Sequence, residues 1–301
     1  MTRYVKPPLS LDQQLCQLLD RGLDIGDHHR ASVYLQRVGY YRLMGYLYTL
    51  REINSDNFQA GATFEDAISL YEFDRALRDL VMEAIGHIEV AVRTSLTYHF
   101  SHAYGAFGHL NAGHFVSSTS QHADWLAEIF KEVRRSKEVF IRHYQNKYTS
   151  PAFPEVPLWM AAEIMSLGSL SRFYGALRGR EQKLVTRDAG VAAPVLQNWL
   201  HVTSVARNVV AHHGRLWNKE LGVSAMRPRS AGWSDREARF PVGRAFFLLL
   251  ILRKLLASTV ADEASWRSRV DAHLKAGLSN QVRVHGFGAD TGWDTHPLWC
   301  P

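Results

Sequence analysis

Cysteine is scarce in this chain of 301 residues, and long apolar runs are missing from it. The two cysteines, Cys16 and Cys300, lie near opposite ends, so no framework of disulfide bridges is expected and a reducing compartment suits the chain. The most apolar run, residues 245–252, is followed by Arg253 and Lys254. A membrane-spanning helix needs about 20 apolar residues, so this shorter run predicts a buried helix.

Signals for secretion and for β-structure are missing as well. The N-terminus is polar and carries no apolar segment of the kind found in signal peptides. The sequence shows no internal repeat, low-complexity tract or strand-rich region, whereas apolar residues recur with helical spacing along most of the chain. We therefore expect an all-α, cytoplasmic protein that has no membrane partner.

The composition is that of a globular protein with a moderate positive charge. Apolar residues make up 46% of the chain and charged residues 21%, which is typical of a soluble domain with a sizeable core. The net charge is +6 with the fifteen histidines neutral. This excess permits binding to an anionic polymer such as RNA, but a mildly basic enzyme of another kind would have the same charge.

Helix signals recur along the chain. Suitable N-cap residues precede three helical patterns, at Ser10 for residues 11–20, at Asp27 for residues 28–38 and at Thr63 for the longest pattern. Further helical patterns cover residues 121–146 and 241–275, while residues 101–118 read as a loop and residues 179–194 as a short polar connection. The predicted organisation is an N-terminal helical layer (1–55), a helical core domain (56–275) and an irregular tail packed on it (276–301).

The helical pattern around residues 195–212 separates apolar from polar side chains. When it is wound at about 100° per residue, two stripes appear on opposite sides. The apolar stripe consists of Val195, Trp199, Val202, Ala206, Val209 and Val210. The polar stripe consists of Gln197, His201, Ser204, Asn208 and His212. We expect the apolar stripe to face the core and the polar stripe to be available for another task.

The end of this helix carries the pattern Arg-Asn-x-x-x-His at Arg207, Asn208 and His212. His212 follows Asn208 by four residues, so the two side chains can meet. Arg207 lies on the shoulder between the stripes and can turn its guanidinium toward the polar side. His213 falls near the edge of the apolar stripe and is expected to point toward the core. Gly214 is a natural place for the helix to end.

An imidazole beside a guanidinium suits phosphodiester chemistry. Histidine can act as a general acid or base near neutral pH, and arginine binds phosphate oxygens with its fork of donors. RNA supplies its own nucleophile, the 2′-hydroxyl, so no further group is needed to attack the phosphate. The simpler interpretation is an ordinary polar helix surface, because an arginine and a histidine at this spacing are common by chance.

Residues 207–212 match the Arg-x4-6-His motif of the HEPN superfamily, in which asparagine commonly follows the arginine. The longer string 207–218 resembles the abortive-infection (Abi) family of bacterial phage-defence proteins, a HEPN branch. Further similar segments are residues 6–10, 39–43, 71–78, 88–93 and 157–160, with a weaker echo at 286–288. The resemblance implies a HEPN-type helical bundle and metal-independent RNA cleavage, usually at a site formed by two HEPN domains.

This comparison suggests a role for each motif residue. His212 would transfer a proton, Arg207 would bind the scissile phosphate, and Asn208 would hold either group. The products would be a 2′,3′-cyclic phosphate and a 5′-hydroxyl, without a metal or another cofactor. One histidine cannot easily serve both proton transfers, so we expect a homodimer with a composite site. His213 could otherwise supply the second imidazole.

Residues outside the motif are assigned supporting roles. His213, Arg215 and Asn218 belong to the same string. Glu89 and Arg93 are either a helix-surface ion pair or groups that orient the catalytic pair. Candidate RNA contacts are Arg42, in a tyrosine-rich stretch, and Arg134, Arg135 and Arg142, although a solvated helix face is the more frequent meaning of such a run.

Two other functions remain possible at this point. The chain could be a non-catalytic RNA- or protein-binding HEPN module under the control of a partner RNA or protein, such as an antitoxin. It could also be a metal-dependent nuclease, but the sequence has no obvious carboxylate cluster for Mg²⁺. The leading hypothesis is therefore an endoribonuclease of an abortive-infection or toxin–antitoxin system.

Overall fold

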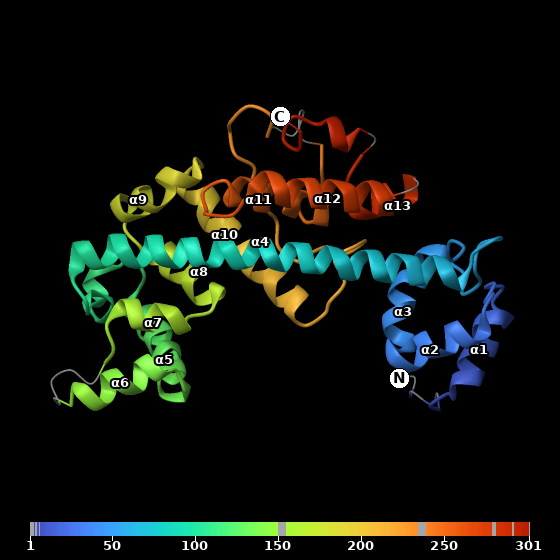
Figure 1. The fold of residues 1–301 in the computed structure, drawn as a ribbon, viewed down its shortest axis with the longest axis horizontal. Helices are drawn as coiled ribbons and strands as arrows, with labels where there is room; N and C mark the ends of the chain where they lie inside the picture. The colour runs from blue at the N-terminus through green and yellow to red at the C-terminus, as the bar shows by residue number, and fades with distance from the viewer. Residues whose placement is uncertain are drawn as a thin grey trace. The chain divides into compact units, whose positions relative to one another are not determined.

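The computed structural model describes residues 3, 5, 7–149, 155–233, 239–278, 281–290 and 292–300 (Figure 1). In these residues the chain forms α-helices and short 3-10 turns, joined by irregular segments. Two isolated β-bridges occur in the described segments, but no strand or sheet. The predicted all-α class is confirmed. No helix in the described part is long and apolar enough to cross a bilayer.

The chain forms two compact units, Met1–Leu77 and Arg78–Pro301. The first contains α1 (Leu11–Asp20), α2 (His28–Arg37), α3 (Tyr40–Leu47) and the start of α4 (Phe64–Tyr104). Residues within each unit contact one another more than they contact the other unit. The domain limits expected from the sequence, at residues 55 and 275, stay a prediction.

Capping in the first unit follows the sequence signals. The Ser10 hydroxyl accepts from the backbone N–H of Gln13, and the Gln13 side chain accepts from the Ser10 N–H, which completes a capping box. The Asp27 carboxylate accepts from the Arg30 N–H at the start of α2. Both N-caps were expected. They satisfy backbone donors that have no partner within the helix.

The second unit is built on the remainder of α4 and nine further helices among the described residues. Their bounds are α5 Thr119–Arg135, α6 Val139–Lys147, α7 Leu158–Ile164, α8 Leu167–Ala176, α9 Gly179–Ala189, α10 Ala193–Ala211, α11 Ala245–Leu256, α12 Glu263–Gly277 and α13 Gln281–Phe287. Within this unit α10 contacts α8, α9 and α11. Residues 245–252 are buried in α11, as their apolar run predicted.

Several predicted boundaries differ from the structure. The pattern over 121–146 is two helices, because Ser136 and Glu138 adopt extended backbone between them. The pattern over 241–275 likewise breaks between α11 and α12, where the Asp262 carboxylate caps the second helix. Residues 179–194 were expected to be a short connection, yet most of them form α9.

The predicted loop and tail also contain more helix than expected. α4 continues to Tyr104, and two 3-10 turns, Gly108–Leu110 and Ala112–His114, follow it. In the tail, α13 forms where no regular element was predicted. Trp293 and Trp299 are buried, and both rings contact Phe246 of α11. Long-range packing therefore orders a segment that is poor in helix formers.

Candidate functional site

α10 separates its faces largely as the sequence predicts. Five members of the apolar stripe are buried: Val195, Trp199, Val202, Ala206 and Val210. On the opposite side Gln197, His201, Asn208 and His212 are exposed. Ser204 is the exception, because it is buried and its hydroxyl donates to the carbonyl of His201 at 2.8 Å. The polar face thus has two exposed ends and a covered middle.

The C-terminus of α10 is closed by a Schellman motif. The last helical residue is Ala211, and His213 adopts a left-handed backbone with φ 55°. The His213 N–H donates to Val210 O at 2.9 Å, and the Gly214 N–H donates to Val209 O at 2.7 Å. A Cβ at Gly214 would lie 2.9 Å from that same Val209 oxygen. Glycine is needed here for close approach rather than for a positive φ.

This helix end corrects the predicted direction of His213. The helical wheel placed its side chain near the core, but the side chain is exposed. The wheel assumes helical backbone up to residue 213, whereas the helix has already ended at Ala211. The left-handed residue turns the chain, so the angle calculated from the wheel no longer applies.

The motif residues lie together on the surface at this helix end. The Arg207 Nη1 donates to the side-chain oxygen of Asn208 at 3.3 Å. The His212 imidazole is exposed and has no hydrogen bond or ion pair with the described residues. Asn208 and His212 are joined through the backbone, from the His212 N–H to the Asn208 carbonyl at 3.1 Å, not through their side chains. A guanidinium, an amide and an unpaired imidazole are therefore accessible to a ligand.

The residues just after the motif anchor the C-terminal segment. Arg215 donates to the Asn218 carbonyl at 3.3 Å, and Arg244 donates to the Asn218 side chain at 3.1 Å. The Asn218 N–H donates to the Gly286 carbonyl at 2.9 Å. Asn218 has a positive φ of 48°, which asparagine tolerates better than most residues. These contacts indicate that Arg215 and Asn218 stabilise the fold near the motif.

Glu89 and Arg93 form a partly buried ion pair on α4, with 2.8 Å between Arg93 Nη2 and Glu89 Oε1. Arg93 also donates to the carbonyls of Ala162 at 2.8 Å and Met165 at 3.2 Å. Both carbonyls lie at the end of α7, where the last carbonyls have no N–H four residues further on to bond with. The Ala162 carbonyl also accepts from the Met165 N–H at 3.1 Å. Neither side chain bonds to the motif residues. Of the two predicted roles, the structure shows the ion pair. In addition, Arg93 caps the C-terminal end of α7.

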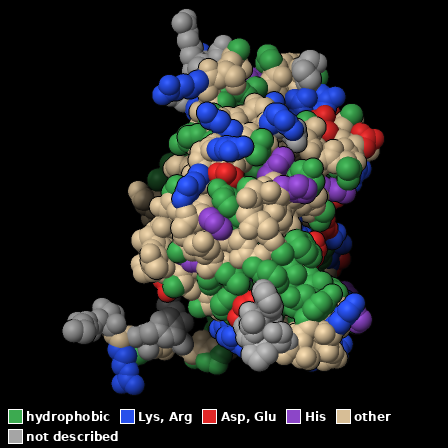
Figure 2. Space-filling model, turned by 90° about the vertical axis from the view of Figure 1, so that its left-hand side faces the viewer, with side chains coloured by type: hydrophobic (Ala, Val, Ile, Leu, Met, Phe, Trp, Pro, Cys, Tyr) green, Lys and Arg blue, Asp and Glu red, His purple; other side chains and the backbone are tan. Residues whose placement is uncertain are grey.

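The candidate RNA-binding arginines are all exposed. Arg42 lies in the first unit, and the other three lie in the second. Arg135 is paired with Glu132 at 3.6 Å, and Arg142 donates to the Lys137 carbonyl at 3.0 Å. Figure 2 shows one face of the molecule on which Lys and Arg side chains gather near the top, with histidines below them. A role in binding RNA stays a prediction for each of the four.

The histidines after α4 include a buried pair. His109 and His122 are buried, and the His122 Nε2–H donates to the His109 carbonyl at 2.9 Å. Burial, together with a smaller contribution from the nearby His122, lowers the pKa of His109 from 6.5 to about 4. The described residues contain no group of three or more His, Cys, Asp or Glu side chains placed to hold a metal ion.

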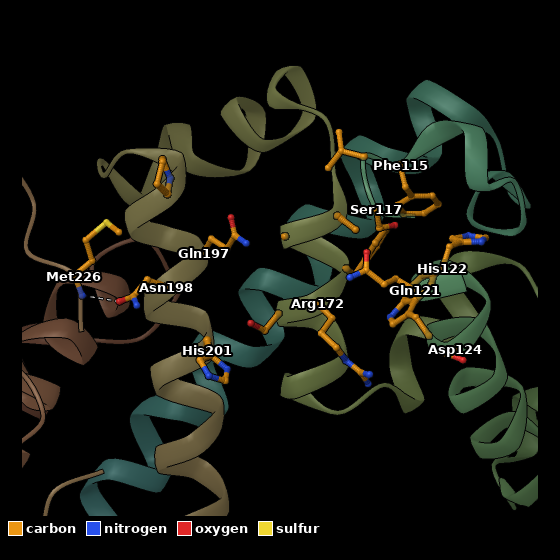
Figure 3. Close-up of a pocket in the computed structure, with 17 residues that line it drawn as sticks. Phe115, Ser117, Gln121, His122, Asp124, Arg172, Gln197, Asn198, His201 and Met226 are labelled. Atoms are coloured by element: carbon orange, nitrogen blue, oxygen red, sulfur yellow. Dashed lines mark hydrogen bonds between the residues drawn. The ribbon is translucent and has the colours of Figure 1, made fainter. Parts of the chain in front are cut away.

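A cavity of about 780 Å³ opens at the other exposed end of the polar face of α10 (Figure 3). Gln197 and His201 of α10 line it, together with parts of α8 and the segment from Phe115 to Trp125. The helical wheel placed Gln197 and His201 on the polar face. It does not predict the cavity, because the opposite wall comes from residues distant in sequence.

A family model described as Abi-like protein matches residues 33–218. The chain belongs to the Abi-like protein family. This membership indicates a role in abortive infection. The matched segment ends at Asn218 and includes the motif. No curated protein and no solved structure matches the chain.

Proposed function

We propose that this Abi-like protein is a metal-independent endoribonuclease of the HEPN superfamily, acting in abortive infection or a toxin–antitoxin system. One observation carries the proposal: the half-buried Arg207, the exposed Asn208 and an exposed His212 imidazole that bonds to none of the described residues lie together at the end of α10. A purely structural polar cluster would use its donors on nearby carbonyls, as Arg93 does. Activation would arrest an infected cell by cutting its RNA.

The chemistry needs only the groups of the chain and the RNA. A base removes the 2′-hydroxyl proton, the 2′-oxygen forms a bond to phosphorus, and the bond from phosphorus to the 5′-oxygen breaks. An acid protonates that leaving oxygen, which yields a 2′,3′-cyclic phosphate and a 5′-hydroxyl. His212 serves as one of these two groups. Arg207 stabilises the charge on the phosphate, and Asn208 positions Arg207 through their hydrogen bond.

The second proton transfer calls for a second imidazole. The exposed helix end permits a second copy of the chain to bring its own motif to the same phosphate, which forms a composite site in a homodimer. The exposed ring of His213 offers an alternative within one chain. Two measurements distinguish the composite site from the site within one chain. Cleavage activity per molecule is measured over a range of protein concentrations, and sedimentation gives the fraction of dimer at each concentration. A composite site loses activity as dimers dissociate, whereas an intramolecular pair retains it.

The principal test is cleavage of RNA by purified protein in the presence of EDTA. His212→Ala and Arg207→Ala should each lower the rate about 100-fold or more, since general acid–base catalysis and stabilisation of the phosphate charge are each worth about that factor. His143→Ala is a matched control, because His143 is exposed on α6, outside the motif. The phosphate end of the product is identified with phosphatase. A 2′,3′-cyclic phosphate resists the phosphatase until the ring is opened, after which the phosphate is removed.

The same assay separates the alternatives. Loss of activity in EDTA indicates a metal-dependent nuclease instead. RNA that is bound but not cut, with no effect of His212→Ala, indicates a non-catalytic binding module. Such a module would act through a partner RNA or protein. If the protein is a nuclease, a partner RNA or protein would act as the antitoxin that restrains the enzyme. Growth arrest on expression of the wild type, but not of His212→Ala, would show that such an antitoxin is needed.

A further inference from the structure

The cavity beside α10 has a size and a mixed lining typical of a ligand site. Its volume of about 780 Å³ is within the usual range for ligand sites. Apolar side chains form part of the wall, among them Phe115, Val116, Pro194 and Met226. Polar side chains converge on it from two sides. In Figure 3, Gln197 and His201 lie on the α10 side of the opening, and Gln121 and Arg172 lie on the opposite side.

Three of these polar groups have hydrogen-bonding capacity to spare. The Gln197 amide and the His201 imidazole are exposed and make no side-chain hydrogen bond with the described residues. Gln121 uses its side-chain oxygen to accept from the Ser118 N–H at 3.1 Å, while its amide nitrogen donates to none of them. Amide and imidazole groups match the donors and acceptors on the edges of nucleobases.

The walls of the cavity are held in place before any ligand arrives. Asn198 accepts from the Met226 N–H at 2.6 Å, and the Trp199 indole donates to the Met226 carbonyl at 2.8 Å. On the other side, the Val116 N–H donates to the Ala176 carbonyl at 2.9 Å. Both apolar edges are therefore fixed by backbone hydrogen bonds. A preformed site loses little conformational entropy on binding.

The charges around the cavity favour a neutral ligand over a phosphate. Arg172 lines the opening, but its guanidinium forms an ion pair with Glu128. Asp124 also lines the opening and is exposed. Arg172 is thus neutralised as the one arginine among the described lining residues, and an additional carboxylate repels anions. A nucleobase carries no charge and meets these conditions.

The position of the cavity connects it with the motif. His201 and His212 share the polar face of α10 and lie roughly 16 Å apart along its axis, from the helical rise. The covered Ser204 separates them. A single RNA strand can therefore contact the helix at two separate points. One point is the motif, and the other is the cavity.

The geometry points to a nucleobase-binding site: this cavity takes one unpaired base of the RNA strand whose phosphate is cut at His212. This inference rests on the proposed function. Gln197 and His201 read the edge of the base, while Val116 and Met226 contact its faces. The site selects single-stranded RNA, because a base within a duplex cannot leave its stack without an energetic cost.

The test uses binding rather than cleavage, so that it does not depend on the nuclease activity. The probes are four 2′-O-methyl hexanucleotides, each with one kind of base, which cannot be cut by 2′-hydroxyl attack. A hexamer of the same backbone without bases is the control ligand. Full-length protein is titrated with each probe, and binding is followed by fluorescence anisotropy. Cleavage of unmodified RNA is measured separately on the same protein.

Matched variants isolate the cavity. Gln197→Ala and His201→Ala should each weaken binding of the preferred hexamer about tenfold. Gln145→Ala and His143→Ala remove the same residue types from exposed positions on α6 and should leave binding unchanged. Gly175→Ala is a third probe. A Cβ there would lie 2.9 Å from the Gln197 side-chain nitrogen and displace it, while alanine favours the helix. It should weaken binding without lowering the melting temperature.

The outcomes distinguish the two proposals. Base-dependent binding that these variants weaken supports the site even where unmodified RNA is not cut, and in that case the nuclease proposal fails alone. Cleavage with no effect of Gln197→Ala or His201→Ala on hexamer binding overturns the site alone. Equal binding of the baseless control, or no binding of any hexamer, also overturns it. If the cavity binds a peptide or another ligand instead of a base, no hexamer is expected to bind in it.

Discussion

Two polar clusters of the second unit show opposite uses of an arginine. Glu89 and Arg93 lie on α4 with side chains 19% and 12% exposed, and Arg93 donates to Glu89 and to two carbonyls at the end of α7. Arg207 and His212 lie at an exposed helix end. There the Arg207 side chain makes one long hydrogen bond to its neighbour, and the His212 imidazole makes none with the described residues.

The difference lies in burial and in the number of partners. Removing a guanidinium from water is costly, and only a full set of acceptors offsets that cost. Arg93 has three acceptors, so its Nε and Nη2 donors are committed to the fold. The His212 imidazole is exposed, and the half-buried Arg207 makes only the long hydrogen bond to Asn208 among the described residues. A substrate can therefore bind both groups with little loss of internal contacts. This comparison predicts that changes at the first cluster affect stability and changes at the second affect activity.

The largest effect on stability is expected at Arg93. Arg93→Ala removes three hydrogen bonds and leaves Glu89 without its partner, which should lower the free energy of unfolding by about 3–4 kcal/mol. Urea denaturation measures the change. Arg135→Ala is the control, because its pair with Glu132 is 69% and 55% exposed, and it should cost less than about 1 kcal/mol. Equal losses in the two variants would contradict the comparison.

The next effect concerns His109, which is buried, in contrast to the exposed His212. Its pKa is lowered from 6.5 to about 4 in the folded protein, so between those values the unfolded chain binds more protons. Stability should therefore fall as pH drops from 6.5 toward 4, by on the order of 3 kcal/mol. Urea denaturation across this pH range tests it. His109→Gln should flatten the slope, and an unaltered slope would show that another group is responsible.

A smaller effect is expected from the left-handed backbone at His213. His213→Gly and His213→Ala both remove the ring, but only glycine accepts φ 55° without strain. The glycine variant should be the more stable of the two by about 1 kcal/mol. Thermal unfolding of the pair isolates this backbone contribution. If the alanine variant is equally stable, the helix does not end in solution as it does here.

The smallest effect on stability is expected at the proposed catalytic residue. His212→Ala should change the free energy of unfolding by less than about 0.5 kcal/mol, because the side chain is exposed and unpaired. Circular dichroism and urea denaturation measure it beside the cleavage assay. If His212→Ala lowered the free energy of unfolding by several times that amount, His212 would stabilise the fold as Arg93 does.

Much of the fold could be predicted from local patterns. Caps at Ser10 and Asp27, the buried run in α11 and the two faces of α10 all depend on residues a few positions apart. Those spacings are set by helical geometry. The interruption after Arg135 and the helix at α13 could not be predicted in this way. Tertiary packing outweighs the small propensity differences that decide such segments.

The candidate site divides in the same manner. The order of Arg207, Asn208 and His212, and their placement on one helix, follow from the sequence alone, because a helical repeat converts spacing into direction. Only the tertiary structure decided the exposure of His213, the partners of Arg93 and the opposite wall of the cavity. Each of these depends on where a helix stops or on a residue far along the chain, as with Arg93 and Ala162. Local periodicity contains no information about such contacts.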